Sequence, residues 1–136
     1  MDSTEADELK LIVIEDEALI ALELEWMLQD LGHRVLAVGA TVDQALALLE
    51  MHAGEADVVL LDANLRGASA VPVAEALKER GVPFILASGY EREELERFGF
   101  REGRVVGKPY SAEDLATALS ALRPRQASIG APTPQD

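Results

Sequence analysis

Four short polar segments, each directly after an apolar run, hold the side chains of this sequence that could carry chemistry. They are Glu15-Asp16 after LIVI, Asp62 after VVLL, Ser88 after FILA and Lys108-Pro109 after RVVG. Three acids, a hydroxyl and a lysine are the groups needed to hold a magnesium ion and a phosphoryl group. In an open α/β sheet, ligands bind at the carboxyl ends of the strands. We therefore expect the four segments to meet at one site.

The acids are interpreted as a metal site. Adjacent carboxylates at Glu15 and Asp16 repel a third one at Asp62 unless a cation lies between them. Mg²⁺ prefers hard oxygen ligands and keeps several waters, so two or three of these carboxylates, the backbone carbonyl of Asn64 and waters would satisfy it, or Mn²⁺ in its place. An ordinary alternative stays open, because a strand-end aspartate can also cap a helix or occupy a turn.

The lysine and the serine complete the set. Lys108 could pair with the carboxylates or with a phosphoryl oxygen as a point charge. Pro109 interrupts the strand after it, and a cis peptide there would set the direction of the lysine. The hydroxyl of Ser88 could bond a phosphoryl oxygen, although Ser-Gly and Lys-Pro are also common turn sequences.

The elements that must position these side chains alternate between strands and helices. Near-continuous apolar runs, typical of buried parallel strands, predict strands over residues 10–14, 34–38, 57–61, 82–87 and 104–106. Helices are expected over residues 17–31, 42–52, 68–80, 91–98 and 111–122, with Gly32 and Gly81 ending two of them and Thr41 and Ser111 opening two. This alternation predicts an α/β fold, a doubly wound five-stranded parallel sheet with five helices.

Length and charge limit the remaining choices. The 136 residues fit one domain, divided here into a flexible lead (1–9), a folded domain (10–123) and a disordered tail (124–136) rich in proline. The net charge of −13 disfavours nucleic acid and anionic membranes as partners. Without cysteine or a long apolar run, the chain is compatible with a cytoplasmic location.

The order of acid pair, acid, hydroxyl and lysine on successive strands resembles the receiver domain of two-component response regulators. The segments VIEDE, LLDANL, LASGY and GKPY carry the resemblance, which spans about residues 9–123. It implies the flavodoxin-like receiver fold and phosphorylation of Asp62 by a sensor histidine kinase or phosphotransfer protein. It also implies that Glu15, Asp16 and the carbonyl of Asn64 hold Mg²⁺, while Lys108 and Ser88 bind the phosphoryl oxygens.

The switch residues depart from the usual receiver pattern. Ser88 matches the switch hydroxyl, but Val105 stands where the switch aromatic is normally found, so Tyr90 is considered as its substitute. The proline that often follows the phosphoacceptor by four residues is Arg66 here. Residues 83–90, PFILASGY, resemble the signature of the FATGUY receiver subgroup, which also lacks the aromatic and acts in alphaproteobacterial stress signalling.

The first expected helix has apolar residues on two faces. Ile20, Leu24 and Leu28 follow the spacing of a core-facing stripe. Leu19, Leu22 and Trp26 lie on roughly the opposite side and are interpreted as a contact surface for a kinase, a phosphotransfer helix or a second copy in a homodimer. The alternative is that they are scattered surface residues.

Three other functions are alternatives to a phosphorylated stand-alone receiver with an unknown downstream protein partner. A pseudo-receiver would bind partners without phosphorylation. A haloacid-dehalogenase-like phosphohydrolase would need a general acid where Asn64 stands, as well as a cap domain. A flavodoxin would need a phosphate-binding loop after the first strand. The receiver interpretation predicts no enzymatic turnover beyond self-phosphorylation and self-dephosphorylation.

Overall fold

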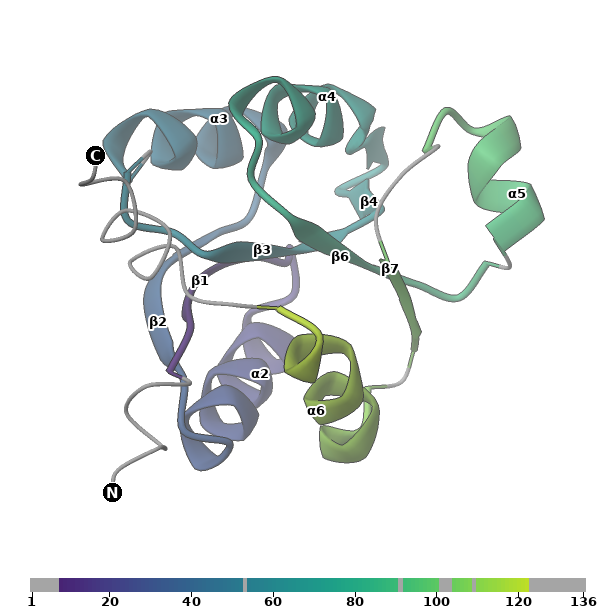
Figure 1. Ribbon diagram of the computed structural model, residues 1–136. Coiled ribbons are helices and arrows are strands. Elements are labelled where there is room, and N and C mark those ends of the chain that lie inside the picture. Colours follow the sequence, from purple (N-terminus) through teal and green to yellow (C-terminus); the bar gives the residue numbers. More distant parts are fainter. Residues whose placement is uncertain (1–7, 53, 91, 101–103, 109, 123–136) are drawn as a thin grey trace, which may run out of the picture.

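A five-stranded parallel sheet forms the centre of the molecule (Figure 1). The computed structural model describes residues 8–52, 54–90, 92–100, 104–108 and 110–122. Its strands are β1 (Lys10–Ile14), β2 (Arg34–Gly39), β3 (Val58–Asp62), β6 (Phe84–Ser88) and β7 (Arg104–Gly107). They lie side by side in the order β2-β1-β3-β6-β7, and all neighbours are parallel. The predicted doubly wound fold is confirmed.

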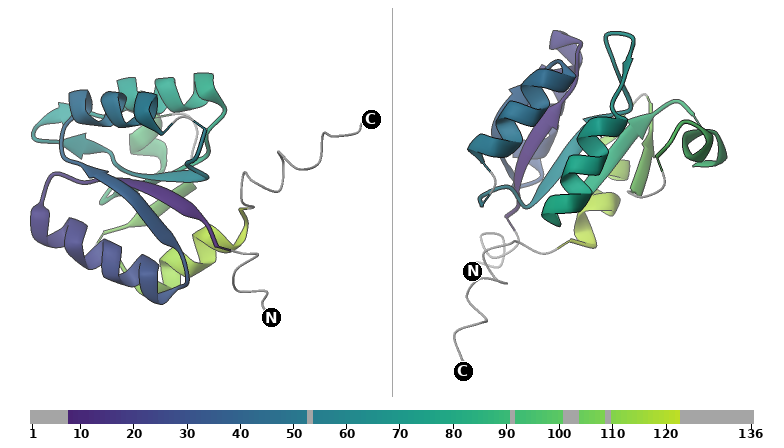
Figure 2. Two further views of the ribbon diagram at one scale, coloured as in Figure 1. Left: turned by 90° about the vertical axis from the view of Figure 1, so that its left-hand side faces the viewer. Right: turned by 90° about the horizontal axis from the view of Figure 1, so that it is seen from above.

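The two faces of the sheet are covered by helices from different parts of the chain (Figure 1; Figure 2, left). Helices α2 (Ala18–Asp30) and α6 (Ala112–Ser120) lie on one face. Helices α3 (Val42–Met51) and α4 (Val71–Arg80) lie on the other, and α5 (Arg92–Arg97) lies beside the β7 edge. Two hydrophobic cores result, one on each side of strands β1, β3 and β6, which explains why these strands read as continuous apolar runs.

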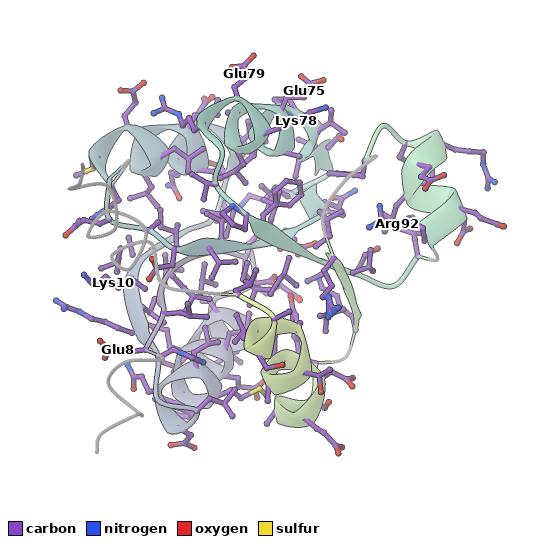
Figure 3. All side chains as sticks on the ribbon, viewed as in Figure 1. Glu8, Lys10, Glu75, Lys78, Glu79 and Arg92 are labelled. Atoms are coloured by element: carbon purple, nitrogen blue, oxygen red, sulfur yellow. The ribbon has the colours of Figure 1, made fainter. Side chains whose placement is uncertain are left out.

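Local signals in the sequence end and begin the helices as expected. The hydroxyl of Thr41 accepts the Gln44 N–H at the start of α3, and Ser111 accepts the Asp114 N–H at the start of α6. Gly81 closes α4 with φ of 70°, a left-handed conformation that favours glycine. The charged side chains of Glu75, Lys78 and Glu79 point outward from α4 (Figure 3).

The segment after β3 is a hairpin, which corrects the helix predicted to begin at residue 68. Strands β4 (Asn64–Leu65) and β5 (Ala68–Ser69) pair antiparallel, and α4 starts only at Val71. Both turn residues, Arg66 and Gly67, have positive φ (54° and 81°), as a tight two-residue hairpin turn requires. The Asn64 side chain stabilises the turn by accepting the Gly67 N–H at 3.0 Å.

The core begins one residue earlier than the sequence indicated. Leu9, which was assigned to the flexible lead, is buried, and its carbonyl accepts the Arg34 N–H at 2.9 Å. Its own N–H donates to Nδ1 of His33 at 3.0 Å. Residues 1–7 of the expected lead, the expected tail and Pro109 lie outside the described residues. Among the described helices, none has the length and apolar character needed to cross a membrane.

Candidate phosphoryl and metal site

The register of the parallel strands brings the predicted site segments to one edge of the sheet. Ile14 pairs with Leu61, Asp62 with Ala87, and Ser88 with Gly107. Residues at these positions end their strands together, so the side chains that follow share the carboxyl edge. The backbone N–H of Lys108 donates to the Ser88 carbonyl at 3.1 Å, which ties the lysine to this edge although it lies after β7.

Three carboxylates meet at this edge. Glu15, Asp16 and Asp62 each offer an oxygen, and these oxygens lie within 4.8 Å of one another. Glu15 is 2% exposed and Asp62 4% exposed, whereas Asp16 is half-buried. The predicted acidic cluster is therefore confirmed. Because its charges are close together and largely shielded from water, a cation is the natural partner.

Backbone and lysine donors hold two of the carboxylates. Asp62 accepts the Asn64 N–H at 3.1 Å on Oδ1 and Nζ of Lys108 at 2.8 Å on Oδ2. Oδ2 of Asp16 accepts the Arg66 N–H at 2.9 Å, so the hairpin turn supports an acid that lies 50 residues earlier in the chain. These bonds fix the directions in which the carboxylates face.

The environment of Glu15 disfavours its charge. The pKa of Glu15 is raised to about 7, chiefly by burial and also by the negative charge of Asp62, against the lowering effects of the Glu17 N–H and of Lys108. Nζ of Lys108 lies 3.8 Å from Oε1 of Glu15. One ammonium shared among three acids leaves the metal-free site with excess negative charge, as expected where a divalent cation binds.

Asp16 and Lys108 both stay charged because the groups around them outweigh the effect of burial. Burial works against the carboxylate of Asp16, but the hydrogen bonds to it, first among them that from the Arg66 N–H, together with the charge of Lys108 hold the pKa of Asp16 below its usual value. Burial likewise works against the ammonium of Lys108, but the hydrogen bond and charge of Asp62 raise its pKa above the usual value. A permanent cation therefore lies against the Asp62 carboxylate.

The comparisons with known proteins agree with this geometry. The family model for the response regulator receiver domain matches residues 11–120. The chain belongs to the response regulator receiver family. Receiver domains are signalling modules of two-component systems rather than enzymes, and they bind Mg²⁺ through acidic residues. They interact with kinases and downstream proteins.

Individual relatives share both sequence and fold with this receiver. The response regulator PhoP of Pseudomonas aeruginosa is 30% identical over 125 residues, covering 89% of this chain and 54% of PhoP. The solution structure of SdrG from Sphingomonas melonis is 38% identical, with a TM-score of 0.70, covering 85% of this chain and 96% of SdrG. PhyR from Brucella abortus is 32% identical, with a TM-score of 0.70, covering 95% of this chain and 55% of PhyR. The chain spans about half the length of the curated relatives it matches.

The positions considered for a receiver switch differ in burial. Ser88 is buried, and its Oγ accepts the Tyr90 N–H at 2.9 Å. The Tyr90 ring is 48% exposed and meets Phe98 edge-to-face, with 5.2 Å between the ring centroids. Val105 lies in β7 and packs against the core on the α3 and α4 side of the sheet. The link from the serine to an exposed aromatic ring thus runs through the backbone amide of Tyr90.

Two groups at the site were missed by sequence reasoning. The hydroxyl of Tyr110 lies 3.3 Å from Oε1 of Glu15, and the backbone N–H of Arg66 supports Asp16. Burial raises the pKa of the Tyr110 hydroxyl, and the negative charges of Glu15 and Asp62 raise it further, so the hydroxyl stays protonated and donates. Tyr110 belongs to the segment GKPY, so its place beside Lys108 in the sequence was a weak indication of its role. A backbone amide is present at nearly every residue, so the sequence could not indicate the role of the Arg66 N–H.

The second apolar face of α2 is exposed to solvent. Leu19 is 76% exposed, Trp26 59% and Leu22 40%. On the side of α2 nearer the site, Ile20 and Met27 line a groove of about 420 Å³ together with Lys108 and Tyr110. The exposed stripe and this groove are therefore two separate features of the same helix.

We predict that Glu15→Gln stabilises the metal-free fold by about 1–3 kcal/mol at neutral pH. Between its usual pKa of 4.5 and the raised value of about 7, Glu15 loses its proton more readily in the unfolded chain, so stability falls as pH rises through this window. Glutamine does not titrate, so it removes this fall in stability. Urea unfolding in EDTA from about pH 5.5 to about pH 8 measures it, and the gain should grow with pH. Glu17→Gln, at an exposed position, is the matched control and should change stability by less than about 0.5 kcal/mol.

Proposed function

We propose that this receiver accepts a phosphoryl group on Asp62 from a sensor histidine kinase or a phosphotransfer protein, in a magnesium-dependent reaction, and signals by protein contact. One observation carries the proposal: the Asp62 carboxylate lies at the carboxyl edge of the sheet, 2.8 Å from the Lys108 ammonium and beside two further acids. A nucleophile, a fixed cation and a set of oxygen ligands are then in one place.

The transfer exchanges one bond for another. An oxygen of Asp62 attacks phosphorus, the bond between phosphorus and the donor's imidazole nitrogen breaks, and the imidazole keeps the electron pair. Lys108 offsets the repulsion between the carboxylate and the phosphoryl oxygens as they approach. Ser88 is proposed to donate its hydroxyl to a phosphoryl oxygen, for which its present bond from the Tyr90 N–H leaves the hydroxyl proton available.

The metal ligands are proposed to be Glu15, Asp16, Asp62 and the carbonyl of Asn64. The donor set fits Mg²⁺, or Mn²⁺, because it consists of hard oxygens whose charge a single lysine does not balance. When bound, the ion neutralises charge that develops on the phosphoryl oxygens. The backbone amides of Asn64 and Arg66 hold the carboxylates of Asp62 and Asp16, two of the proposed ligands, in fixed directions.

Phosphorylation is proposed to act through the loop after β6. If Ser88 turns toward the phosphoryl group, the bond from the Tyr90 N–H to its Oγ is lost and the Tyr90–Phe98 contact is free to change. Val105 supplies no aromatic ring for this purpose. A solved structure of SdrG, 39% identical over 82% of this chain and with a TM-score of 0.68, is the BeF3-activated conformation of that protein, which supports an activated conformation for this receiver.

The proposed location, subgroup and partners rest on the net charge of the chain and on its sequence resemblance to other receivers. We propose a cytoplasmic receiver of the FATGUY subgroup, which the sequence of residues 83–90 supports. The net charge of −13 supports the absence of a nucleic-acid or membrane partner. The exposed stripe of Leu19, Leu22 and Trp26 is proposed as the contact for a protein partner or for a second copy of the chain.

Uptake from a small donor tests the proposal. We expect the protein to gain about 80 Da, the mass of one phosphoryl group, when incubated with acetyl phosphate or phosphoramidate and Mg²⁺, and to gain nothing in EDTA. Intact mass spectrometry reports the gain, and hydroxylamine should remove it because the product is an acyl phosphate. A folded protein that stays unmodified by both donors in Mg²⁺, and by a histidine kinase that phosphorylates other receivers, would instead support a receiver that works without phosphorylation.

A further inference from the structure

Tyr110 is held in a fixed place between the core and the metal site. Its ring packs against the hydrophobic core formed with α2 and α6, and Ser111, the next residue, caps α6. Its hydroxyl reaches Glu15 from 95 positions later in the chain. The packing of the ring and the helix cap at the next residue therefore restrict where the Tyr110 hydroxyl can lie.

Glu15 receives a donor on each of its two oxygens. Oε2 accepts the Glu17 N–H at 3.1 Å, and Oε1 accepts the Tyr110 hydroxyl at 3.3 Å. A carboxylate has about four lone-pair positions, so these two bonds fix its plane and leave positions free to face a cation or its waters. Without the tyrosine bond, Oε1 would lose its hydroxyl donor, and Lys108 would remain 3.8 Å away.

We propose that Tyr110 is a positioning residue that orients Glu15 for Mg²⁺. Hydrogen bonds of this kind, from a neighbour to a ligand, align the ligand before the ion arrives and commonly change metal affinity 10- to 100-fold. The 3.3 Å distance places the expected effect at the lower end of that range. The inference rests on the proposed function, because it assumes that Glu15 takes part in holding the ion.

Tyr110→Phe tests it, because phenylalanine keeps the ring in the core and removes only the hydroxyl. We expect the dissociation constant for Mg²⁺, measured by isothermal titration calorimetry on the whole chain, to rise about 10-fold. The thermal unfolding midpoint in EDTA should change little, which shows that packing is intact. Phosphoryl uptake at saturating Mg²⁺ should match the wild-type rate, since the hydroxyl acts on the metal ligand rather than on phosphorus.

A double-mutant comparison separates positioning from packing. In a Glu15→Ala background, Tyr110→Phe should change Mg²⁺ affinity by less than about twofold, because the oxygen that accepts the hydroxyl is gone. An equal loss in both backgrounds, or an unchanged affinity in the single variant, overturns the inference and leaves the proposed function standing. A wild-type chain that binds no Mg²⁺ at all overturns both.

Discussion

Replacing Asp62 with asparagine is expected to abolish phosphoryl uptake completely, with no gain of mass from acetyl phosphate at any Mg²⁺ concentration. Asparagine keeps the size of the side chain and can still accept the Asn64 N–H through its amide oxygen. It has neither the negative charge nor the nucleophilic oxygen that forms the acyl phosphate. The variant should therefore remain folded and lose only the ability to accept the phosphoryl group.

The matched control is Asp30→Asn, which removes the same charge from the exposed end of α2. Its uptake should equal that of the wild type, because exposed charges far from the site are screened by salt. Circular dichroism should show both variants folded. A mass gain of about 80 Da that persists in Asp62→Asn would place the phosphoryl group on another residue and contradict the proposed role of Asp62.

Lys108→Met is expected to lower the rate of uptake about 100- to 1000-fold while tightening Mg²⁺ binding several-fold. The ammonium that is lost lies 2.8 Å from Oδ2 of Asp62 and would stabilise the charge of the transferring group, which is the kind of contact whose removal costs rates of this size. The same ammonium competes with a metal ion for the acids. Its removal should therefore move the rate and the affinity in opposite directions.

These opposite directions make the lysine prediction specific. Damage to the fold would weaken both metal binding and uptake, whereas loss of one cation from an intact site weakens only uptake. Lys78→Met, on the exposed side of α4, is the matched control and should leave both quantities unchanged. Single-turnover uptake followed by intact mass, together with calorimetric Mg²⁺ titration, measures the pair. An uptake rate within about threefold of wild type would remove Lys108 from the proposed mechanism.

The elements and most of the site were predictable because their signals are local. A buried parallel strand is a short apolar run, and the polar residue that follows it must lie at the carboxyl edge of the sheet. Glu15, Asp62 and Lys108 could therefore be placed together before any contact was known. In the structure, Nζ of Lys108 lies 2.8 Å from Asp62 and 3.8 Å from Glu15. The helix caps at Thr41 and Ser111 were equally predictable, since each depends on a residue three positions away.

The hairpin after β3 was not predicted, for a physical reason that concerns Arg66. Positive φ at a residue other than glycine costs energy and is rare, so the sequence from residue 68 reads more simply as the start of a helix. The turn is supported by its contacts, since the Arg66 N–H finds the Asp16 carboxylate and the Asn64 side chain accepts the Gly67 N–H. Only the first of these contacts joins distant parts of the chain, and it exists only after the sheet has formed.

By itself, then, the sequence determined the order of strands and helices, the chemical groups at the strand ends and the receiver-like pattern they make. Tertiary structure alone decided the raised pKa of Glu15. It also decided two hydrogen bonds, from the Tyr110 hydroxyl to Glu15 and from the Arg66 amide to Asp16. The reason is that burial and contacts between residues 50 to 95 positions apart have no local period in the sequence. They arise when parallel strands bring distant loops to one edge, and they turn a set of suitable residues into a site.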